Sequence, residues 1–383
     1  MSTLSKKGKI AVSVVVCAVV IAVIVGLSVF AWLYTFDYPD GPVEKATSIE
    51  LPEDGKIRVL QLTDLHLTAP AWNGRDSQTL EWVKEAIRMS DPDVIAVTGD
   101  AVGSNYFYRQ RDKGIVAIAE ICEEAGIPWM FTYGNHDGEW SWQTGAMVGP
   151  ENAEQGKEEI LEVLQGYKYS LMTRGDTDGV GNYVIDVVDK DGKTVFGLIN
   201  MDSHDKIFRE NGEKSGYAGV TADQVAWYER EIKALNARGD GDVKSALFMH
   251  VPLYEYQDAL DNYPLWGDFH SYTLQDKCYV PETNIGLYDK IAELRSTQFV
   301  TAGHDHDHNF AVMYEGPDGI NADFPVILHY ARCSGVNAWE RRVPIGASVI
   351  DIDVLSDDVE SMYKISVIEP PRDFYYDEYE GWR

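Results

Sequence analysis

The sequence predicts an α/β fold in which two β-sheets pack against each other and carry helices on their outer faces. Short apolar runs alternate with helical patterns from Ile57 onward, and this alternation is typical of parallel βαβ units. Near the C-terminus, apolar runs at 325–330, 347–354 and 362–368 follow one another as predicted antiparallel strands. Apolar residues make up 45% of the 383-residue chain, which is enough for the cores of such a domain.

The first half of the predicted domain alternates strand and helix. Strands are predicted at 58–62, 93–98 and 129–133, because each is a short apolar run bounded by turn residues. The first intervening helix has an apolar face that includes Ile87, and the second stops at Gly126. In parallel sheets of this kind, ligand sites lie beyond the carboxyl ends of the strands.

The second half begins with a predicted hairpin of strands 182–188 and 194–200. Thr221 and Gln224 then form a capping box, which marks the start of a helix. The remaining predicted strands that deliver polar clusters are 245–249 and 299–302.

Residues 10–34 form a charge-free run rich in Val, Ala and Ile. As a helix rising about 1.5 Å per residue, this run would span roughly 37 Å, more than a bilayer core requires. Lys6, Lys7 and Lys9 precede it, and positive flanks stay on the cytoplasmic side. The sequence therefore predicts a single-pass signal anchor in the cell membrane, with the rest of the chain extracytoplasmic.

The chain is strongly acidic after this run, with 30 basic residues against 62 acidic ones. Such a surface repels nucleic acid backbones, so no duplex partner is expected, and no feature predicts a protein partner. A phosphate-bearing ligand would need local cations. The predicted parts are a cytoplasmic basic stub (1–9), the transmembrane anchor (10–34), a linker (35–54), the folded domain (55–372) and an acidic aromatic tail (373–383).

The cysteines give little information about function. Cys17 lies in the predicted anchor and Cys122 on the apolar face of a predicted helix. Cys278 and Cys333 could pair in an oxidising exterior, although their spacing does not require a disulfide.

Polar clusters with nitrogen and oxygen donors follow five of the predicted strands. Taken singly, Asp100 could cap a helix and His250 could be a hydrogen-bonded core histidine. Five such clusters together are hard to explain as capping, and their donor types hold Zn, Mn or Fe in proteins. The clusters are Asp64 with His66, Asp100, Asn135 with His136, His250, and His304 with His306.

This ordered series of Asp-x-His, Gly-Asp, Gly-Asn-His-Asp, isolated His and Gly-His-x-His resembles the calcineurin-like metallophosphoesterases. The residues that flank the motifs are similar to those of the purple acid phosphatase-like branch. The resemblance covers about residues 57 to 310. It implies a four-layer α/β/β/α sandwich of two mixed sheets and a phosphoesterase with two divalent transition-metal ions, Mn, Zn or Fe.

The resemblance also implies a role for each matched residue. His136 would contact the phosphate and protonate the leaving oxygen after attack of a metal-bound hydroxide, with Asp137 orienting its ring. Asp100 would bridge the two ions, since a carboxylate oxygen can serve two cations. The first ion would be held by Asp64, His66, Asp100 and His306, and the second by Asp100, Asn135, His250 and His304.

One position departs from the family pattern. Many relatives carry Asp, Asn or Tyr three residues after the bridging aspartate, and Gly103 stands there in this chain. Tyr106 and Tyr108 would substitute only if the loop folded differently. The departure favours two divalent ions over a ferric site with a tyrosinate ligand.

The leading functional hypothesis is a membrane-anchored, outward-facing hydrolase of phosphate esters. A phosphodiesterase acting on nucleotides or phospholipid headgroups is an alternative, because the metal site does not by itself distinguish monoesters from diesters. A catalytically dead surface binding module is a second alternative, and it would be expected to lack a ligand or His136. His204 follows a predicted strand and is a candidate for the substrate pocket, the alternative being a plain strand-end turn. Tyr254 belongs to an aromatic loop after His250, which could either cover the substrate or only pack against the domain.

Overall fold

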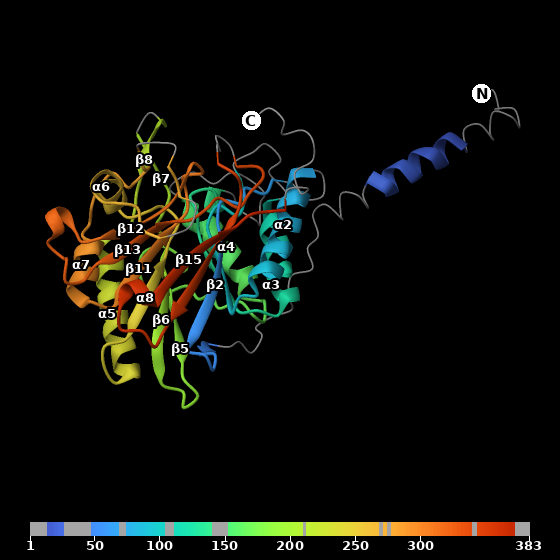
Figure 1. Ribbon diagram of the computed structural model, residues 1–383. Helices are drawn as coiled ribbons and strands as arrows, with labels where there is room; N and C mark the ends of the chain where they lie inside the picture. Colours follow the sequence, from blue (N-terminus) through green and yellow to red (C-terminus); the bar gives the residue numbers. More distant parts are fainter. Residues whose placement is uncertain are drawn as a thin grey trace, which may run out of the picture. The chain divides into compact units, whose positions relative to one another are not determined.

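The computed structural model divides the chain into two compact units, Met1–Pro39 and Asp40–Arg383 (Figure 1). The first unit contains a helix over 14–26 whose side chains are exposed. No helix in the described ranges has the length and apolar character needed to cross a membrane. The predicted anchor at 10–34 extends beyond the described residues on both sides. The structure describes residues 14–26, 47–68, 74–103, 111–139, 152–209, 212–267, 271–273, 277–338 and 343–371.

The smaller of two mixed sheets has five strands in the order β15-β14-β2-β3-β4. Strands β2, β3 and β4 run parallel, whereas β14 is antiparallel to both of its neighbours, β2 and β15. The strands are β2 (Lys56–Leu62), β3 (Val94–Thr98), β4 (Trp129–Thr132), β14 (Ala347–Asp353) and β15 (Tyr363–Ile368).

The larger sheet has eight strands in the order β1-β5-β6-β9-β11-β13-β12-β10. Strands β6, β9, β11 and β13 are parallel to one another, and β12 and β10 add an antiparallel edge. The strands are β1 (Ser48–Glu50), β5 (Tyr183–Val188), β6 (Thr194–Asn200), β9 (Lys244–Phe248), β10 (Tyr272–Thr273), β11 (Thr297–Ala302), β12 (His308–Tyr314) and β13 (Val326–Tyr330); β7 (Lys206–Phe208) and β8 (Lys214–Tyr217) form a separate hairpin.

Helices cover the outer faces of the two sheets (Figure 1). Helix α2 packs on β2 and on α3, while α5 packs on β6, α6 on β12 and α7 on β11. Helix α5 begins with the predicted capping box of Thr221 and Gln224. The helices are α2 (Gly74–Ser90), α3 (Arg111–Ala125), α4 (Ala153–Leu164), α5 (Ala222–Gly239), α6 (Glu255–Asn262), α7 (Leu287–Leu294) and α8 (Val359–Met362), with 3₁₀ turns η1 (Asp137–Glu139) and η3 (Pro317–Gly319).

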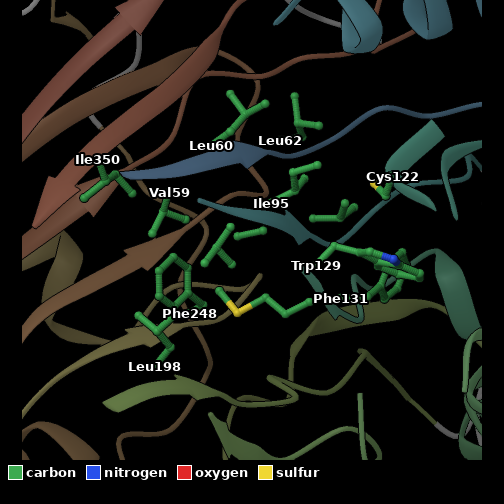
Figure 2. Close-up of a cluster of buried hydrophobic side chains, with 14 of the residues drawn as sticks. Val59, Leu60, Leu62, Ile95, Cys122, Trp129, Phe131, Leu198, Phe248 and Ile350 are labelled. Atoms are coloured by element: carbon green, nitrogen blue, oxygen red, sulfur yellow. The ribbon is translucent and has the colours of Figure 1, made fainter. Parts of the chain in front are cut away.

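Two apolar cores follow from the alternation of side chains along the central strands. In β9, Ala246 and Phe248 belong to the core shared with the smaller sheet, and Leu247 belongs to the core beneath the outer helices of the larger sheet. Figure 2 shows Val59 and Ile350 of the smaller sheet facing Phe248 of the larger one. The prediction of an α/β fold with two mixed sheets is confirmed.

Two details of the predicted organisation are wrong. Strand β1 lies inside the predicted linker 35–54 and pairs in parallel with β5. A three-residue edge strand is too short to show a periodic pattern, and its partner lies far along the chain. The three C-terminal runs do not form one antiparallel set, because β13 joins the larger sheet beside β11 whereas β14 and β15 join the smaller one. The predicted stub at 1–9 and tail at 373–383 lie outside the described residues.

A buried ion cluster joins α4 to the segment between β6 and β7. The Nζ of Lys157 is fully buried and lies 2.9 Å from an oxygen of Asp202 and 2.8 Å from one of Asp205. Asp202 also accepts from the backbone N–H groups of Val180 and His204. Burial opposes the charge on Lys157, yet the two carboxylates raise its pKa, so the ammonium stays charged.

Replacing Lys157 with Met should lower the free energy of unfolding by about 3–5 kcal/mol, because two buried carboxylates would lose their shared cation. Urea denaturation of the full-length chain, followed by circular dichroism, measures the change. The matched control is Lys84→Met, which removes an exposed lysine of α2 and should cost less than about 1 kcal/mol. A loss equal to that of the control would contradict the structural role given to Lys157.

Candidate metal centre

Five loops at the carboxyl ends of β2, β3, β4, β9 and β11 meet at one end of the two sheets. Backbone hydrogen bonds continue the strand pairing into these loops. The N–H of His66 donates to the carbonyl of Asp100 (2.9 Å), and the N–H of Gly303 donates to the carbonyl of His250 (3.1 Å). The side chains that follow the strands therefore converge, as expected for parallel strands.

The converging side chains form two groups of potential metal ligands. The first is Asp64, His66 and His306, and in each group the donor atoms lie within 4.8 Å of one another. The Nε2 atoms of His66 and His306 are 2.9 Å apart, and the Nε2 of His306 is 3.5 Å from Oδ1 of Asp64. Atoms that share an ion at about 2.0–2.2 Å must lie this close together. The second group is Asp100, His250 and His304.

Asp100 lies between the two groups. Its Oδ2 is 3.8 Å from Nε2 of His66 and 3.3 Å from Nε2 of His250. Its Oδ1 accepts from the backbone N–H of His136 at 2.9 Å, which fixes the rotation of the carboxylate. One oxygen is thus directed at both groups, as a bridging ligand requires.

The hydrogen bonding of the site fits metal ligands. Among the described residues, Oδ1 of Asn135 and both ring nitrogens of His304 are buried without a hydrogen-bond partner, an arrangement that is costly unless another ligand satisfies these atoms. The Nδ1–H of His250 donates to the carbonyl of Thr98 at 2.8 Å. That bond directs Nε2 at Asp100, and such a hydrogen bond is the usual support for a metal-binding histidine.

The backbone at the site is strained in a way that only close packing maintains. Asp64, His66, Asp100 and His304 all have positive φ, at 55°, 48°, 48° and 91°. Non-glycine residues rarely adopt this conformation, and such residues cluster at functional sites. A Cβ on Gly134 would lie 2.2 Å from both the N and Oδ1 of Asp100, so no larger residue fits beside the bridging carboxylate.

Burial and mutual charge set the protonation of the ligands. Burial lowers the pKa of His66 to about 3, so its imidazole is neutral, as metal binding requires. For His250, burial opposes the charged form, but the Asp100 carboxylate raises the pKa to about 10. An ion at this site would therefore displace a proton from His250.

His136 lies in the same cavity as Asp100, and its partners differ from the prediction. Its Nδ1 lies 3.1 Å from Oε1 of Glu139 and 3.0 Å from Nζ of Lys206. The predicted role of Asp137 in orienting the ring is wrong, because its two oxygens accept from the backbone N–H groups of Gly134 and Val102. The 3₁₀ turn η1 explains the difference, since it places residue i+3 beside residue i.

A cavity of about 370 Å³ opens over the two ligand groups. Hairpin β7–β8 supplies Lys206, Lys214 and Tyr217 to its wall, and the sequence analysis did not identify these residues. In the sequence, the one feature that could have indicated these residues is the closeness of two lysines in an acidic chain. The residues lining the cavity are Asp100, Asn135, His136, Lys206, Lys214, Tyr217, Tyr279, His304, Asp305, His306 and Asp307.

Neither additional pocket candidate lines this cavity. Tyr254 is 47% exposed and borders a separate small cavity beside Pro252 and Ile285. His204 is turned away, with its Nε2 2.8 Å from Oε1 of Gln224 in α5. Both predictions are wrong because following a strand end fixes the place of the backbone but not the direction of a side chain.

Three further observations bear on the predicted chemistry. Cys278 and Cys333 are both buried free thiols, so they are not paired. Cys278, Asp305 and His308 also lie within 4.8 Å of one another next to the cavity.

A Cβ on Gly103 would lie 3.4 Å from the ring of His66, so this position faces the first ligand group. Tyr106 and Tyr108 lie outside the described residues.

Comparison with known families agrees with the geometry of the site. Residues 57–308 match the model of the family described as calcineurin-like phosphoesterase. The chain belongs to this family. The fold uses two divalent metal ions, and the two ligand groups around Asp100 are the candidate positions for them.

Relatives of this phosphoesterase are similar over about 70% of its length. An Arabidopsis thaliana protein named "Probable inactive purple acid phosphatase 28" is 24% identical and aligns over 69% of both chains. The Saccharomyces cerevisiae "Phosphatase DCR2" is 26% identical over 70% of this chain and 47% of its own length. An uncharacterised Schizosaccharomyces pombe protein is 23% identical over 73% of this chain, which spans about half of that relative. A dimetal phosphatase structure from Danio rerio aligns with a TM-score of 0.47 at 9% identity, over 77% of this chain and 92% of that one.

The purified full-length chain should hold close to two transition-metal ions after reconstitution with Mn, Zn or Fe. Replacing Asp100 with Asn should reduce this to fewer than one ion, since both groups would lose their shared anionic ligand. Elemental analysis by mass spectrometry measures the content. Asp351→Asn, which changes a carboxylate paired with Arg58 in the smaller sheet, is the matched control and should retain both ions. Two ions in Asp100→Asn, or only traces in the unsubstituted chain, would contradict the assignment.

Proposed function

We propose that this calcineurin-like phosphoesterase hydrolyses phosphate esters at the centre around Asp100, with His136 as the general acid. The observation that carries the proposal is the convergence of two ligand groups on one carboxylate beneath a cavity that also contains His136. When bound, two divalent ions would supply an activated water and offset the charge of the phosphate.

The chain itself would position the substrate and move the proton. His136 is fixed from two directions, because its backbone N–H donates to Asp100 and its ring contacts Glu139. Burial opposes ionisation of Glu139, but its contacts with His136 and Lys206 lower its pKa to about 2, so it remains an anion beside the ring. The ring of His136, held between Glu139 and Lys206, would give a proton to the leaving oxygen.

The alternative functions differ in the features that they require. A catalytically dead binding module would be expected to lack a metal ligand or His136, and all eight residues are present here. Two relatives carry "inactive" in their names, so activity has to be measured for this chain. A phosphodiesterase acting on nucleotides or phospholipid headgroups would use the same centre, and a panel of monoesters and diesters separates it from a monoesterase.

Replacing His136 with Asn should leave the metal content unchanged and lower kcat on the order of 10²–10⁴-fold for a phosphate ester with a poor leaving group. The loss should be smaller for 4-nitrophenyl phosphate, because nitrophenolate leaves with little help from an acid. Steady-state kinetics on this pair of substrates, together with elemental analysis, makes the test. His204→Asn is the matched control, since His204 lies outside the cavity. Equal losses on the two substrates would contradict the role as an acid.

We also propose that residues 10–34 anchor the chain in the cell membrane, with the phosphoesterase domain outside the cytoplasm. The charge-free run and the three lysines that precede it support this proposal. An extracytoplasmic domain would meet substrates outside the cell, where the strong negative charge of the domain keeps it away from anionic lipid.

Protease added to intact cells that lack an outer barrier should remove a C-terminal epitope tag and leave an N-terminal tag intact. The reason is that the lysines hold the N-terminus in the cytoplasm. Immunoblots of both tags, with permeabilised cells as the control, report the orientation. Protection of the C-terminal tag until permeabilisation would contradict the proposed topology.

A further inference from the structure

Hairpin β7–β8 brings two ammonium groups to the wall of the cavity, and they have different surroundings. Lys206 is paired, since its Nζ lies 2.8 Å from Oε1 of Glu139 and 3.0 Å from Nδ1 of His136. Lys214 donates to the hydroxyl of Tyr217 at 2.6 Å and lies 3.9 Å from the centre of that ring. In the part of the chain that the structure describes, no carboxylate lies within ion-pair distance of Lys214.

In the described part of the chain, no neighbouring carboxylate balances the positive charge of Lys214. Burial and the neighbouring charge of Lys206 lower its pKa, and Asp305 is the carboxylate that opposes this shift. Asp305 uses its Oδ2 to accept from the backbone N–H of Tyr279 at 2.9 Å. Lys214 is an exposed ammonium on the cavity wall, and an anion can bind it without breaking an ion pair to a carboxylate.

Tyr217 connects this position to the metal centre. Its ring meets the ring of His304 edge to face, with centroids 4.3 Å apart. Lys214, Tyr217 and His304 therefore line one side of the same cavity. A cavity of about 370 Å³ has room for a small phosphate ester.

The hairpin itself is held in place from outside the cavity. The hydroxyl of Ser215 donates to Oε1 of Glu282 at 2.7 Å, and the N–H of Glu282 donates to the carbonyl of Tyr217 at 3.1 Å. These contacts fix β8, so the position of Lys214 does not depend on a bound ligand.

From these contacts we propose that Lys214 and Tyr217 form a subsite for a second anionic group of the substrate. The substrate class is then a compact phosphate ester that also carries a carboxylate or a second phosphate, and not the phosphate ester of a neutral alcohol. This inference rests on the proposed function, since it names the substrate of the same centre. Lys206 and the centre around Asp100 receive the phosphate that is cleaved, and Lys214 receives the other group.

The test compares 3-phosphoglycerate with glycerol 3-phosphate on the full-length, metal-loaded chain. The two molecules share a three-carbon skeleton and differ in a carboxylate against a hydroxymethyl group. We expect kcat/KM to be on the order of 10- to 100-fold higher for 3-phosphoglycerate, mainly through KM, as one charge-assisted hydrogen bond predicts. A third substrate, propane-1,3-diol bisphosphate, has a second phosphate and no carboxylate, so it distinguishes a preference for carboxylate from one for phosphate.

Lys214→Met should abolish the preference, whereas Lys214→Arg should keep most of it because it retains the charge. Lys193→Met, which removes a lysine in the turn between β5 and β6, is the matched control. A preference that survives in Lys214→Met, or equal rates on the two substrates in the unsubstituted chain, would overturn the subsite and leave the proposed function standing. If neither substrate is hydrolysed, the panel of monoesters and diesters decides the proposed function, and calorimetry decides the subsite. Tighter binding of 3-phosphoglycerate by the unsubstituted chain than by Lys214→Met would support it, and equal binding would overturn it.

Discussion

The carboxylate of Asp100 is the constraint on which the rest of the site depends. One of its oxygens faces both ligand groups and the other is fixed by the N–H of His136. Three loops must therefore bring a nitrogen atom to within 3.8 Å of one side chain. The glycine at 134 allows that approach, and the positive φ of Asp64, His66 and Asp100 records its conformational cost.

Such a site lowers the stability of the fold, because charges are buried and the backbone is strained. The two-sheet architecture offsets this cost through its two large apolar cores, one between the sheets and one beneath α5 and α7. The loops extend directly from buried parallel strands, so their starting positions are fixed to the precision of the sheets. The packed core, rather than contacts among the ligands, thus sets the positions of the ligand side chains.

The sequence predicted the features that depend on residues adjacent to one another in the chain. An apolar run followed by a polar cluster identified the strand ends, and with them the residues that the structure brings together around Asp100. The contacts of His136 were not predictable in this way. A 3₁₀ turn places Glu139 beside the ring of His136, and Asp137 binds backbone N–H groups instead. Hairpin β7–β8 was missed because its strands have three and four residues, and contacts with the distant Glu282 hold it in place.

A second set of long-range contacts would couple the proposed catalysis to substrate choice. Asp205 binds the buried ammonium of Lys157, and the next residue, Lys206, begins β7 and reaches the ring of His136. Helix α4 therefore supports both η1, which carries His136's partner Glu139, and the hairpin that carries Lys214. In a chain with a net charge of −29, an anionic substrate finds cations only where the fold places them. Here the fold places two lysines on one short hairpin, so any shift of that hairpin would change the support of His136, the proposed general acid, together with the proposed second anion position.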